Sequence, residues 1–289
     1  MAKSISPLRY PGGKAKVYNQ IVELLTKNNK LEITYIEPFA GGCGLALMLL
    51  KNNIVSNLIL NDIDKSIYCF WKSVLKYNTE LCQMIDSAIL NLEEREIQKF
   101  IQNNKEKINI RKKEDVLKLG FSTFYLNRVN RSGIINAGVI GGIKQTGNYK
   151  MDCRFNKRKL IEKIQKNLEL EHKIDGFKKE IKIRFYNLDV IDFLKIIKKK
   201  DSFIFFDPPY YKKGKDLYVN FYEHNDHLNL ANKISKLKND WIVTYDNEEE
   251  IKKMYNQFRQ KEFDITYSLE NKRKAKEIII FSDSLKNIL

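Results

Sequence analysis

The residues of this chain best suited to chemistry are Asp207, Pro208, Pro209 and Tyr210, which directly follow the apolar run 203–206. A strand that ends in a carboxylate places a hydrogen-bond acceptor at the edge of a sheet. The two prolines fix the backbone, and their carbonyls accept hydrogen bonds without an accompanying N–H. An aromatic ring follows at once. Acceptors beside an aromatic face predict a preorganised clamp for a flat base that carries an amine.

A second group of candidate residues lies in a glycine-rich turn at residues 37–44, EPFAGGCG. The apolar segment 33–39 predicts a strand before this turn, and residues 57–60 predict the next strand, which ends at Asp62 and Asp64. Strand, glycine turn, helix, strand and acid is the order of a nucleotide-binding βαβ unit. The turn lacks Gly-x-Gly-x-x-Gly and a phosphate-binding lysine. An adenosine compound without phosphates therefore fits better than NAD or ATP, with one of the two acids on its ribose.

The α/β alternation that positions these groups resumes in the second half of the chain. Its predicted strands are 181–186, 202–206 and 241–245, followed by a closing hairpin of 263–268 and 277–281. Its predicted helices are 191–197, 224–237 and 248–255. The fold class is therefore predicted to be α/β, with residues 1–78 and 177–289 forming one domain.

Residues 79–176 lose the alternation and predict an insertion. Helical spacing dominates up to Leu126, and the stretch 127–154 then combines glycines with Arg, Asn and Gln. These polar side chains match the edges of guanine and adenine, and a long loop in a compact domain usually has a function. We interpret it as a recognition loop or hairpin; the alternative is a solvated connection. The candidate DNA contacts are Arg128, Asn130, Arg131, Asn136, Gln145, Asn148 and Arg154.

Composition favours a nucleic-acid partner. The net charge of +16 and the pI of about 9.4 suit a dense array of phosphates. The four cysteines are scattered, without Cys-x-x-Cys or histidines at ligand spacing, so neither a disulfide framework nor a metal site is expected. The longest apolar run near the start, 45–50, is too short for a bilayer, and no signal peptide is evident. We expect a cytoplasmic protein without membrane contact.

Five motifs give the chain a family resemblance. They are Tyr10-Pro-Gly-Gly-Lys14, Glu37-Pro-Phe-Ala-Gly-Gly42, Asn61-Asp-Ile-Asp64, Asn187-Leu-Asp189 and Asp207-Pro-Pro-Tyr210. In this order and spacing the chain resembles the Dam-type, or D12 class, DNA adenine N6-methyltransferases over nearly its whole length. The resemblance implies a Rossmann-like S-adenosylmethionine-dependent methyltransferase sheet. It also implies that the mostly helical, loop-bearing insertion is a target-recognition domain.

The resemblance further implies roles for single residues. The residues that it places around S-adenosylmethionine are Tyr10, Lys14, Glu37, Phe39, Ala40, Gly41, Asp62, Asp189, Val190 and Asp207. Among these, Asp62 would hold the ribose, and Asp189 with Val190 would bracket the adenine ring. Asp207 and the Pro208 carbonyl would accept the two amine hydrogens of a flipped-out adenine, on which Tyr210 would stack. Positioning and electrostatics then supply most of the acceleration.

One departure from the family pattern concerns the target sequence. Asn136 falls about where the Dam pattern has an arginine that reads a guanine, so GATC specificity is not expected. We hypothesise that Arg131, Asn136, Gln145 and Asn148 form a different reading surface. The expected partner is double-stranded DNA, and the protein is expected to be a monomer or weak dimer. The enzyme would belong to a restriction-modification system, with a cognate endonuclease, or be an orphan or phage type.

Two alternatives stay open at this point. An amine clamp does not specify the ring, so an N4-cytosine or RNA-base methyltransferase is the second hypothesis. The third hypothesis is a catalytically inactive DNA-binding homologue.

Overall fold

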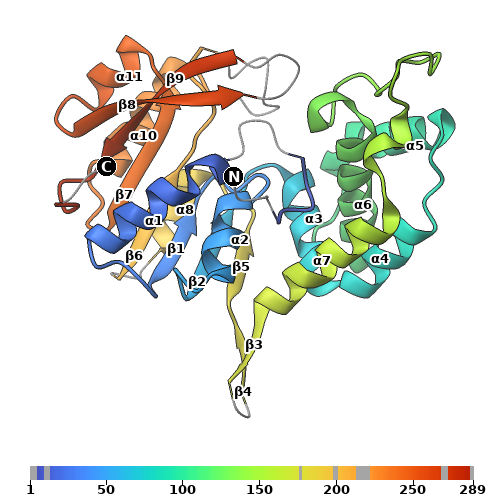
Figure 1. The fold of residues 1–289 in the computed structure, drawn as a ribbon, viewed down its shortest axis with the longest axis horizontal. Coiled ribbons are helices and arrows are strands. Elements are labelled where there is room, and N and C mark those ends of the chain that lie inside the picture. The colour runs from blue at the N-terminus through green and yellow to red at the C-terminus, as the bar shows by residue number, and fades with distance from the viewer. Residues whose placement is uncertain are drawn as a thin grey trace.

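The main feature of the fold is a seven-stranded sheet with the strand order β5-β2-β1-β6-β7-β9-β8 (Figure 1). The computed structural model describes residues 5–9, 14–175, 178–197, 201–212, 222–267 and 273–286. The strands of the sheet are β1 (Thr34–Glu37), β2 (Asn57–Asn61), β5 (Ile183–Tyr186), β6 (Ser202–Phe206), β7 (Asp240–Asp246), β8 (Arg259–Tyr267) and β9 (Arg273–Phe281). The sheet confirms the predicted α/β class, and it is consistent with an S-adenosylmethionine-dependent methyltransferase fold.

The order in which successive strands are added to the sheet reverses between β1 and β6. Strands β5, β2, β1, β6 and β7 are parallel, and the chain grows outward on one side through β2 and β5 and on the other through β6 and β7. The antiparallel pair β8 and β9 then closes the edge beside β7, which confirms the predicted hairpin. In open α/β sheets, ligands bind beyond the carboxyl ends of the strands at such a reversal.

Alternate residues of each central strand enter two separate apolar cores. Tyr35, Phe203 and Phe205 pack on one face of the sheet, whereas Ile36 and Ile204 pack on the other. This two-residue period is what a strand with both faces covered requires. Helices α1 (Tyr18–Lys27), α2 (Gly44–Lys51) and α3 (Lys65–Lys76) cover the first face; α8 (Val190–Ile196), α10 (His224–Ile234) and α11 (Glu249–Met254) cover the second.

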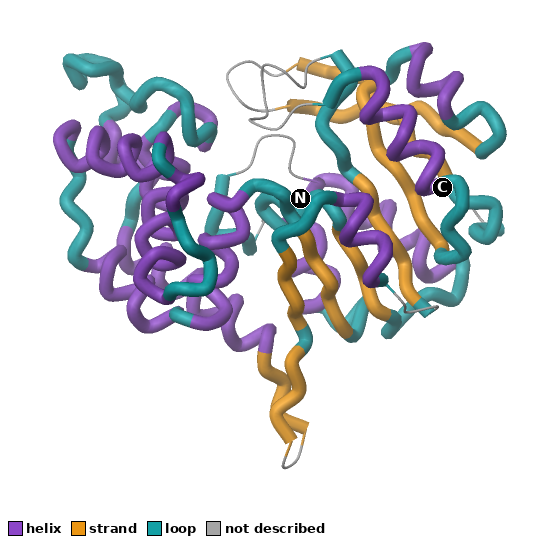
Figure 2. Tube along the Cα trace, turned by 180° about the vertical axis from the view of Figure 1, so that it is seen from behind, coloured by secondary structure: helices purple, strands orange, loops and turns teal. Residues whose placement is uncertain are grey.

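The middle of the chain forms a group of helices to one side of the sheet (Figures 1 and 2). Its elements are α4 (Asn78–Asp86), α5 (Leu92–Asn103), η2 (Lys105–Lys107), α6 (Lys113–Val129), η3 (Arg131–Gly133), η4 (Met151–Arg154) and α7 (Lys157–Glu171). Phe70 of α3 stacks on Phe124 of α6, with ring centroids 5.9 Å apart. Both rings are fully buried in the core that also covers the first face of the sheet. The helical group therefore shares an apolar core with the sheet.

Two parts of the structure differ from the sequence-based expectation. A small antiparallel hairpin, β3 (His172–Asp175) and β4 (Lys178–Ile181), precedes β5 and projects from the body (Figure 1). Its mixed polar and charged residues lack the clear alternation that would predict strands. The loop between α6 and α7 is a series of turns with a single β-bridge, Asn130 to Val139, rather than a regular hairpin. No helix in the described part of the chain is long and apolar enough to span a membrane.

Candidate active site

The predicted motifs meet at the carboxyl edge of the parallel strands. Glu37 ends β1, Asp62 follows β2, Asp189 follows β5 and Asp207 follows β6. Because these strands are neighbours in the sheet, four carboxylates that are far apart in sequence lie along one edge. Asn61 ties two of the loops together, since its side chain donates to the Pro38 carbonyl at 3.1 Å and accepts from the Leu188 N–H at 3.0 Å.

Asp207 presents one oxygen to its neighbours and leaves the other open. The Thr244 hydroxyl donates to Oδ1 at 2.8 Å, and the Lys14 ammonium lies 3.1 Å from the same oxygen. Within the described residues no donor contacts Oδ2, and the side chain is 21% exposed. Burial raises the pKa of Asp207, while the ammonium of Lys14 opposes that shift. Oδ2 is thus a preorganised acceptor for an amine hydrogen.

Lys14 joins Asp207 to a second acid that the motifs do not contain. Its ammonium lies 3.1 Å from Glu277 Oε2, and the Tyr210 hydroxyl donates to Glu277 Oε1 at 2.7 Å. Glu277 is 1% exposed and lies on β9, far in sequence from Lys14, which begins η1 (Lys14–Val17). The signal that could have revealed it is an acid inside the strand, next to the apolar run 278–281.

Tyr210 is held by this cluster with its ring almost covered. Tyr210 is 4% exposed, and the Lys14 ammonium lies 5.4 Å from the centroid of its ring. A base can stack on this ring only if neighbouring groups move when it enters, so the stacking role stays a prediction. Pro208 and Pro209 are also buried, as expected for residues that fix the loop.

Asp246, at the end of β7, shapes the backbone after the clamp. Its two carboxylate oxygens accept from the N–H groups of Tyr211 and Lys212, at 2.8 and 3.0 Å. Burial raises the pKa of Asp246, and the two backbone donors oppose that shift. Thr244 and Asp246 are polar residues inside the strand-like segment 240–246, the signal by which the sequence could have identified them.

Asp62 organises the glycine turn and can still accept from a ligand. Its Oδ2 accepts from the Gly41 N–H at 2.8 Å, and its Oδ1 accepts from the Asp64 N–H at 2.9 Å. Trp71 donates to the Gly41 carbonyl at 2.9 Å, and Gly41 has a φ of 47°, a conformation that favours glycine. Asp64 instead caps α3 through the Ser66 N–H, which leaves Asp62 as the candidate for a ribose.

Glu37 is a buried acid beside Asp207. Tyr35 donates its hydroxyl to Glu37 Oε1 at 3.0 Å. Burial raises the pKa of Glu37 to about 8. The hydrogen bond from Tyr35 lowers this pKa, and the negative charge of Asp207 raises it. Phe39 is half-buried and meets Tyr222 edge to face, with centroids 6.0 Å apart. Tyr222 is thus an aromatic neighbour of the glycine turn that the motifs did not indicate.

The remaining predicted cofactor residues make no hydrogen bond to the other predicted site residues within the described part of the chain. Asp189 is exposed and accepts from the Ile191 N–H at 2.8 Å, so it caps α8, while Val190 is buried. Ala40 is also buried, in the turn that follows β1. Tyr10 lies outside the residues that the structure describes.

Three of the seven predicted DNA contacts make hydrogen bonds within the protein. Asn130 is fully buried, accepting from Arg95 Nε at 2.8 Å and donating to the Ile135 carbonyl at 2.7 Å. Gln145 donates to the Ile140 carbonyl at 2.8 Å and accepts from the Met151 N–H at 2.9 Å. These two side chains hold the loop and cannot read a base at the same time.

Arg128 is also largely buried, and its Nη2 donates to the Pro7 carbonyl, so it is not displayed toward a base edge. The other four predicted contacts are exposed and stay candidates: Arg131, Asn136, Asn148 and Arg154.

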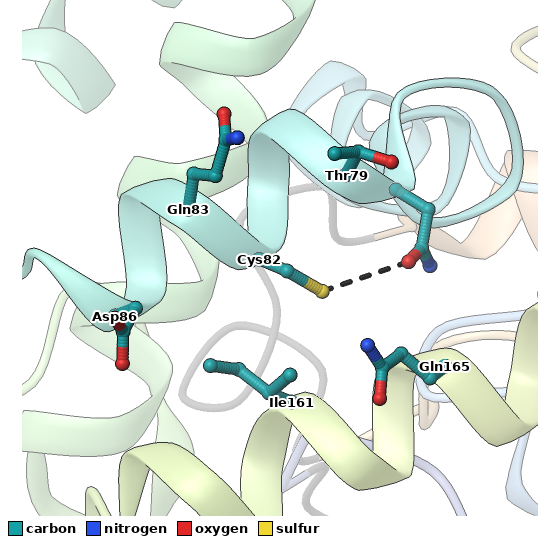
Figure 3. Close-up of a pocket in the computed structure, with 7 residues that line it drawn as sticks. Thr79, Cys82, Gln83, Asp86, Ile161 and Gln165 are labelled. Carbon is teal, nitrogen blue, oxygen red and sulfur yellow. Dashed lines mark hydrogen bonds between the residues drawn. The ribbon is translucent and has the colours of Figure 1, made fainter.

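A groove away from this edge lies between α4 and α7 (Figure 3). It has a volume of about 310 Å³, and Thr79, Cys82, Gln83 and Gln165 are among its lining residues. Its only acid is Asp86, and no predicted motif residue lines it. We assign it no part in the chemistry.

Comparisons with known proteins agree with the geometry of the sheet edge. A sequence model of a family described as D12 class N6 adenine-specific DNA methyltransferase matches residues 10–269. The Type II methyltransferase M.MjaIII of Methanocaldococcus jannaschii is 26% identical over 212 residues, which are 70% of this chain and 68% of that protein. The family match contains all five motifs and Asp246, whereas Glu277 lies beyond it.

Proposed function

Since the chain belongs to the D12 class of N6 adenine-specific DNA methyltransferases, we propose that Asp207 is the residue that orients the adenine amine. The enzyme methylates adenine N6 in DNA at specific sites. The observation that supports the role of Asp207 is its asymmetry: Thr244 and Lys14 engage Oδ1, and Oδ2 is left for the substrate. The carbonyl of Pro208, the next residue, is proposed as the second acceptor.

We propose S-adenosylmethionine as the methyl donor. The charges of the site fit it, because Glu37, Asp62, Asp189 and Asp207 gather at this edge, and a cationic ligand is stabilised by carboxylates. The proposed contacts are Asp62 for the ribose, Asp189 and Val190 for the adenine ring, and Glu37, Phe39, Ala40 and Gly41 for the remainder. When bound, this donor supplies a methyl group that the positive charge of its sulfonium activates.

The residues of the clamp then act mainly by positioning. Two acceptors on the amine hydrogens turn the nitrogen lone pair away from the ring system and toward the donor. Lys14 fixes the Asp207 carboxylate, and its charge keeps that carboxylate ionised. Once the nitrogen carries the methyl group it loses a proton, and Oδ2 of Asp207 is placed to accept it. The burial that raises the pKa of Asp207 makes it a better acceptor for that proton.

We propose residues 79–176 as the target-recognition part, acting on duplex DNA from which the adenine is flipped. The exposed Arg131, Asn136, Asn148 and Arg154 are its proposed contacts, and the guanine-reading arginine of the Dam pattern has no counterpart at Asn136. Arg131, Asn136 and Asn148 lie on the loop between α6 and α7, from which exposed side chains can reach base edges in a groove.

The decisive experiment measures transfer of labelled methyl groups to duplex DNA at low salt, followed by nucleoside analysis of the product. N6-methyladenine is the expected product. N4-methylcytosine, label in RNA alone, or no transfer at all would each contradict the proposal in a distinguishable way. Mapping the modified adenines in DNA from expressing cells would identify the target sequence.

Binding of S-adenosylmethionine is expected to release a proton from Glu37. At neutral pH the raised pKa of about 8 keeps this acid mostly protonated, and a cationic ligand favours its ionised form. Affinity should therefore rise with pH up to about pH 8 and then level off. Calorimetry in two buffers with different ionisation enthalpies measures the released proton. Glu37→Gln should reduce both effects to the part that comes from Asp62, whose pKa burial raises to about 7. An unchanged pH dependence in that variant would exclude Glu37 as a source.

A further inference from the structure

Two arginines are held together where residues 5–9 dock on the end of α6. Asn127 joins the two segments, because it accepts from the Arg9 N–H at 2.8 Å and donates to the Arg9 carbonyl at 2.7 Å. The Arg9 guanidinium also donates to the Asn130 carbonyl at 3.2 Å. Next along α6, Arg128 donates from Nη2 to the Pro7 carbonyl. The amino-terminal segment and α6 thus bring two guanidinium groups to one place.

Arg128 is buried with most of its donors unused. It is 8% exposed, and its guanidinium carbon lies 5.8 Å from the centroid of the Phe124 ring. The Pro7 carbonyl is its one hydrogen-bond acceptor within the described residues, and the buried Nε has none. A guanidinium has five N–H donors, and a buried donor without an acceptor destabilises the fold. Such an arrangement indicates that an acceptor is supplied by a ligand.

A third arginine, Arg154, ends η4, which contacts the helix α6 that carries Arg128, and it adds a like charge near Arg9 and Arg128. Burial lowers the pKa of Arg128, and the positive charges of Arg9 and Arg154 lower it further. Burial and the charge of Arg154 likewise lower the pKa of Arg9. No carboxylate pairs with any of the three within the described part of the chain, whereas Arg95 and Arg158 each pair with a glutamate. The three charges repel one another unless an anion lies between them.

We propose that Arg9, Arg128 and Arg154 form a binding site for a phosphate group of the DNA backbone. The inference rests on the proposed DNA substrate. Planar guanidinium groups form paired hydrogen bonds with phosphate oxygens. A bound phosphate would therefore give the buried arginine the acceptors that it lacks, in charge-assisted hydrogen bonds. The site would fix the position of the duplex without reading its sequence.

The position of the site along the chain connects it to the clamp. Lys14 lies five positions after Arg9 in the chain, which limits the distance between their Cα atoms to about 18 Å. One helical turn of DNA measures about 34 Å, so the bound phosphate would lie within roughly one turn of the flipped base. Asn127 also donates to the Gly133 carbonyl at 2.7 Å, at the start of the recognition loop. A phosphate bound here would fix the position of the DNA relative to both the recognition loop and the clamp.

The first test uses the salt dependence of binding to a short duplex of mixed sequence, for which phosphate contacts dominate. Arg154→Gln should lower the slope of log Kd against log salt concentration by about 0.9, the value for one phosphate contact. Arg158→Gln is the matched control, because Arg158 is 90% exposed and pairs with Glu162. An unchanged slope in Arg154→Gln, or an equal decrease in the control, would overturn the site.

The second test uses inorganic sulfate as a probe and needs no DNA. Sulfate should raise the Tm of the full chain more than NaCl of equal ionic strength, and by more than it raises the Tm of Arg154→Gln or Arg128→Met. Arg158→Gln keeps the proposed site, so its response to sulfate should match that of the wild type, whereas the two site variants report the general stabilising effect of sulfate. Equal sulfate effects in all four proteins would refute the site.

Neither measurement depends on methyl transfer. A chain that passes both tests yet makes no N6-methyladenine would refute the proposed function alone, and an active enzyme that fails them would refute this site alone.

Discussion

Asp207→Asn is expected to slow methyl transfer by about 10²–10³-fold while the affinities for DNA and for the cofactor change little. In the wild type, Thr244 and Lys14 contact Oδ1, so the amide oxygen of the variant should occupy that position. The amide NH₂ would then replace Oδ2. A donor would face the two amine hydrogens of adenine, and the nitrogen lone pair would lose its alignment.

Single-turnover transfer measured beside equilibrium binding separates these effects. A rotated amide is disfavoured, because its NH₂ would face the Lys14 ammonium. Thr244→Val is the comparison variant: it removes one donor to Oδ1 but keeps the carboxylate, so its loss of rate should be smaller. Transfer by Asp207→Asn at close to the wild-type rate would contradict the proposed role of Oδ2.

Lys14→Met is expected to destabilise the protein by about 3–5 kcal/mol at pH 8, in addition to reducing activity. It removes a buried ammonium that lies 3.1 Å from both Asp207 and Glu277, of which Glu277 is 1% exposed. Two carboxylates would then lose this cation in a place of low dielectric. Denaturant unfolding measures the free energy change.

Protonation should reverse part of this loss. Burial raises the pKa of Asp207, and the variant removes the Lys14 charge that opposes this shift. The contribution of Asp207 to stability is therefore retained below its unfolded pKa and is lost as pH rises. The destabilisation should therefore be smaller at pH 5 than at pH 8. The double variant Lys14→Met/Glu277→Gln should regain stability at pH 8 but not activity. If the stability lost in Lys14→Met did not depend on pH or on Glu277, the loss would come from packing and not from charge.

Much of the scaffold was predictable from local patterns. Runs of apolar residues at strand spacing located β1, β2, β6 and β7, because a strand covered on both faces must be apolar throughout. The elements differ from the predictions mainly at their ends, as with β1, which is Thr34–Glu37 rather than 33–39. The motifs then placed their acids after strand ends, where a parallel sheet exposes them along one edge.

The recognition loop shows where residue type alone misleads. Arg, Asn and Gln are the residues that read bases, and the same donors and acceptors satisfy buried backbone groups in a loop without regular structure. Asn130 and Gln145 make the second kind of contact, and Arg128 is buried against the amino-terminal segment. Contacts with distant segments bury Asn130 and Arg128, and the turns of the loop itself engage Gln145, whereas Arg131 and Asn148 are exposed.

The sequence by itself determined the α/β class, the family and the order of the motifs, since each depends on residues that are close together in the chain. The tertiary structure alone decided which groups surround Asp207. Lys14, Thr244 and Glu277 come from the amino terminus, β7 and β9, and only the order of strands in the sheet brings them to one carboxylate. The physical reason is that hydrogen bonding and charge act over a few ångströms in space, whereas sequence patterns report neighbours along the chain.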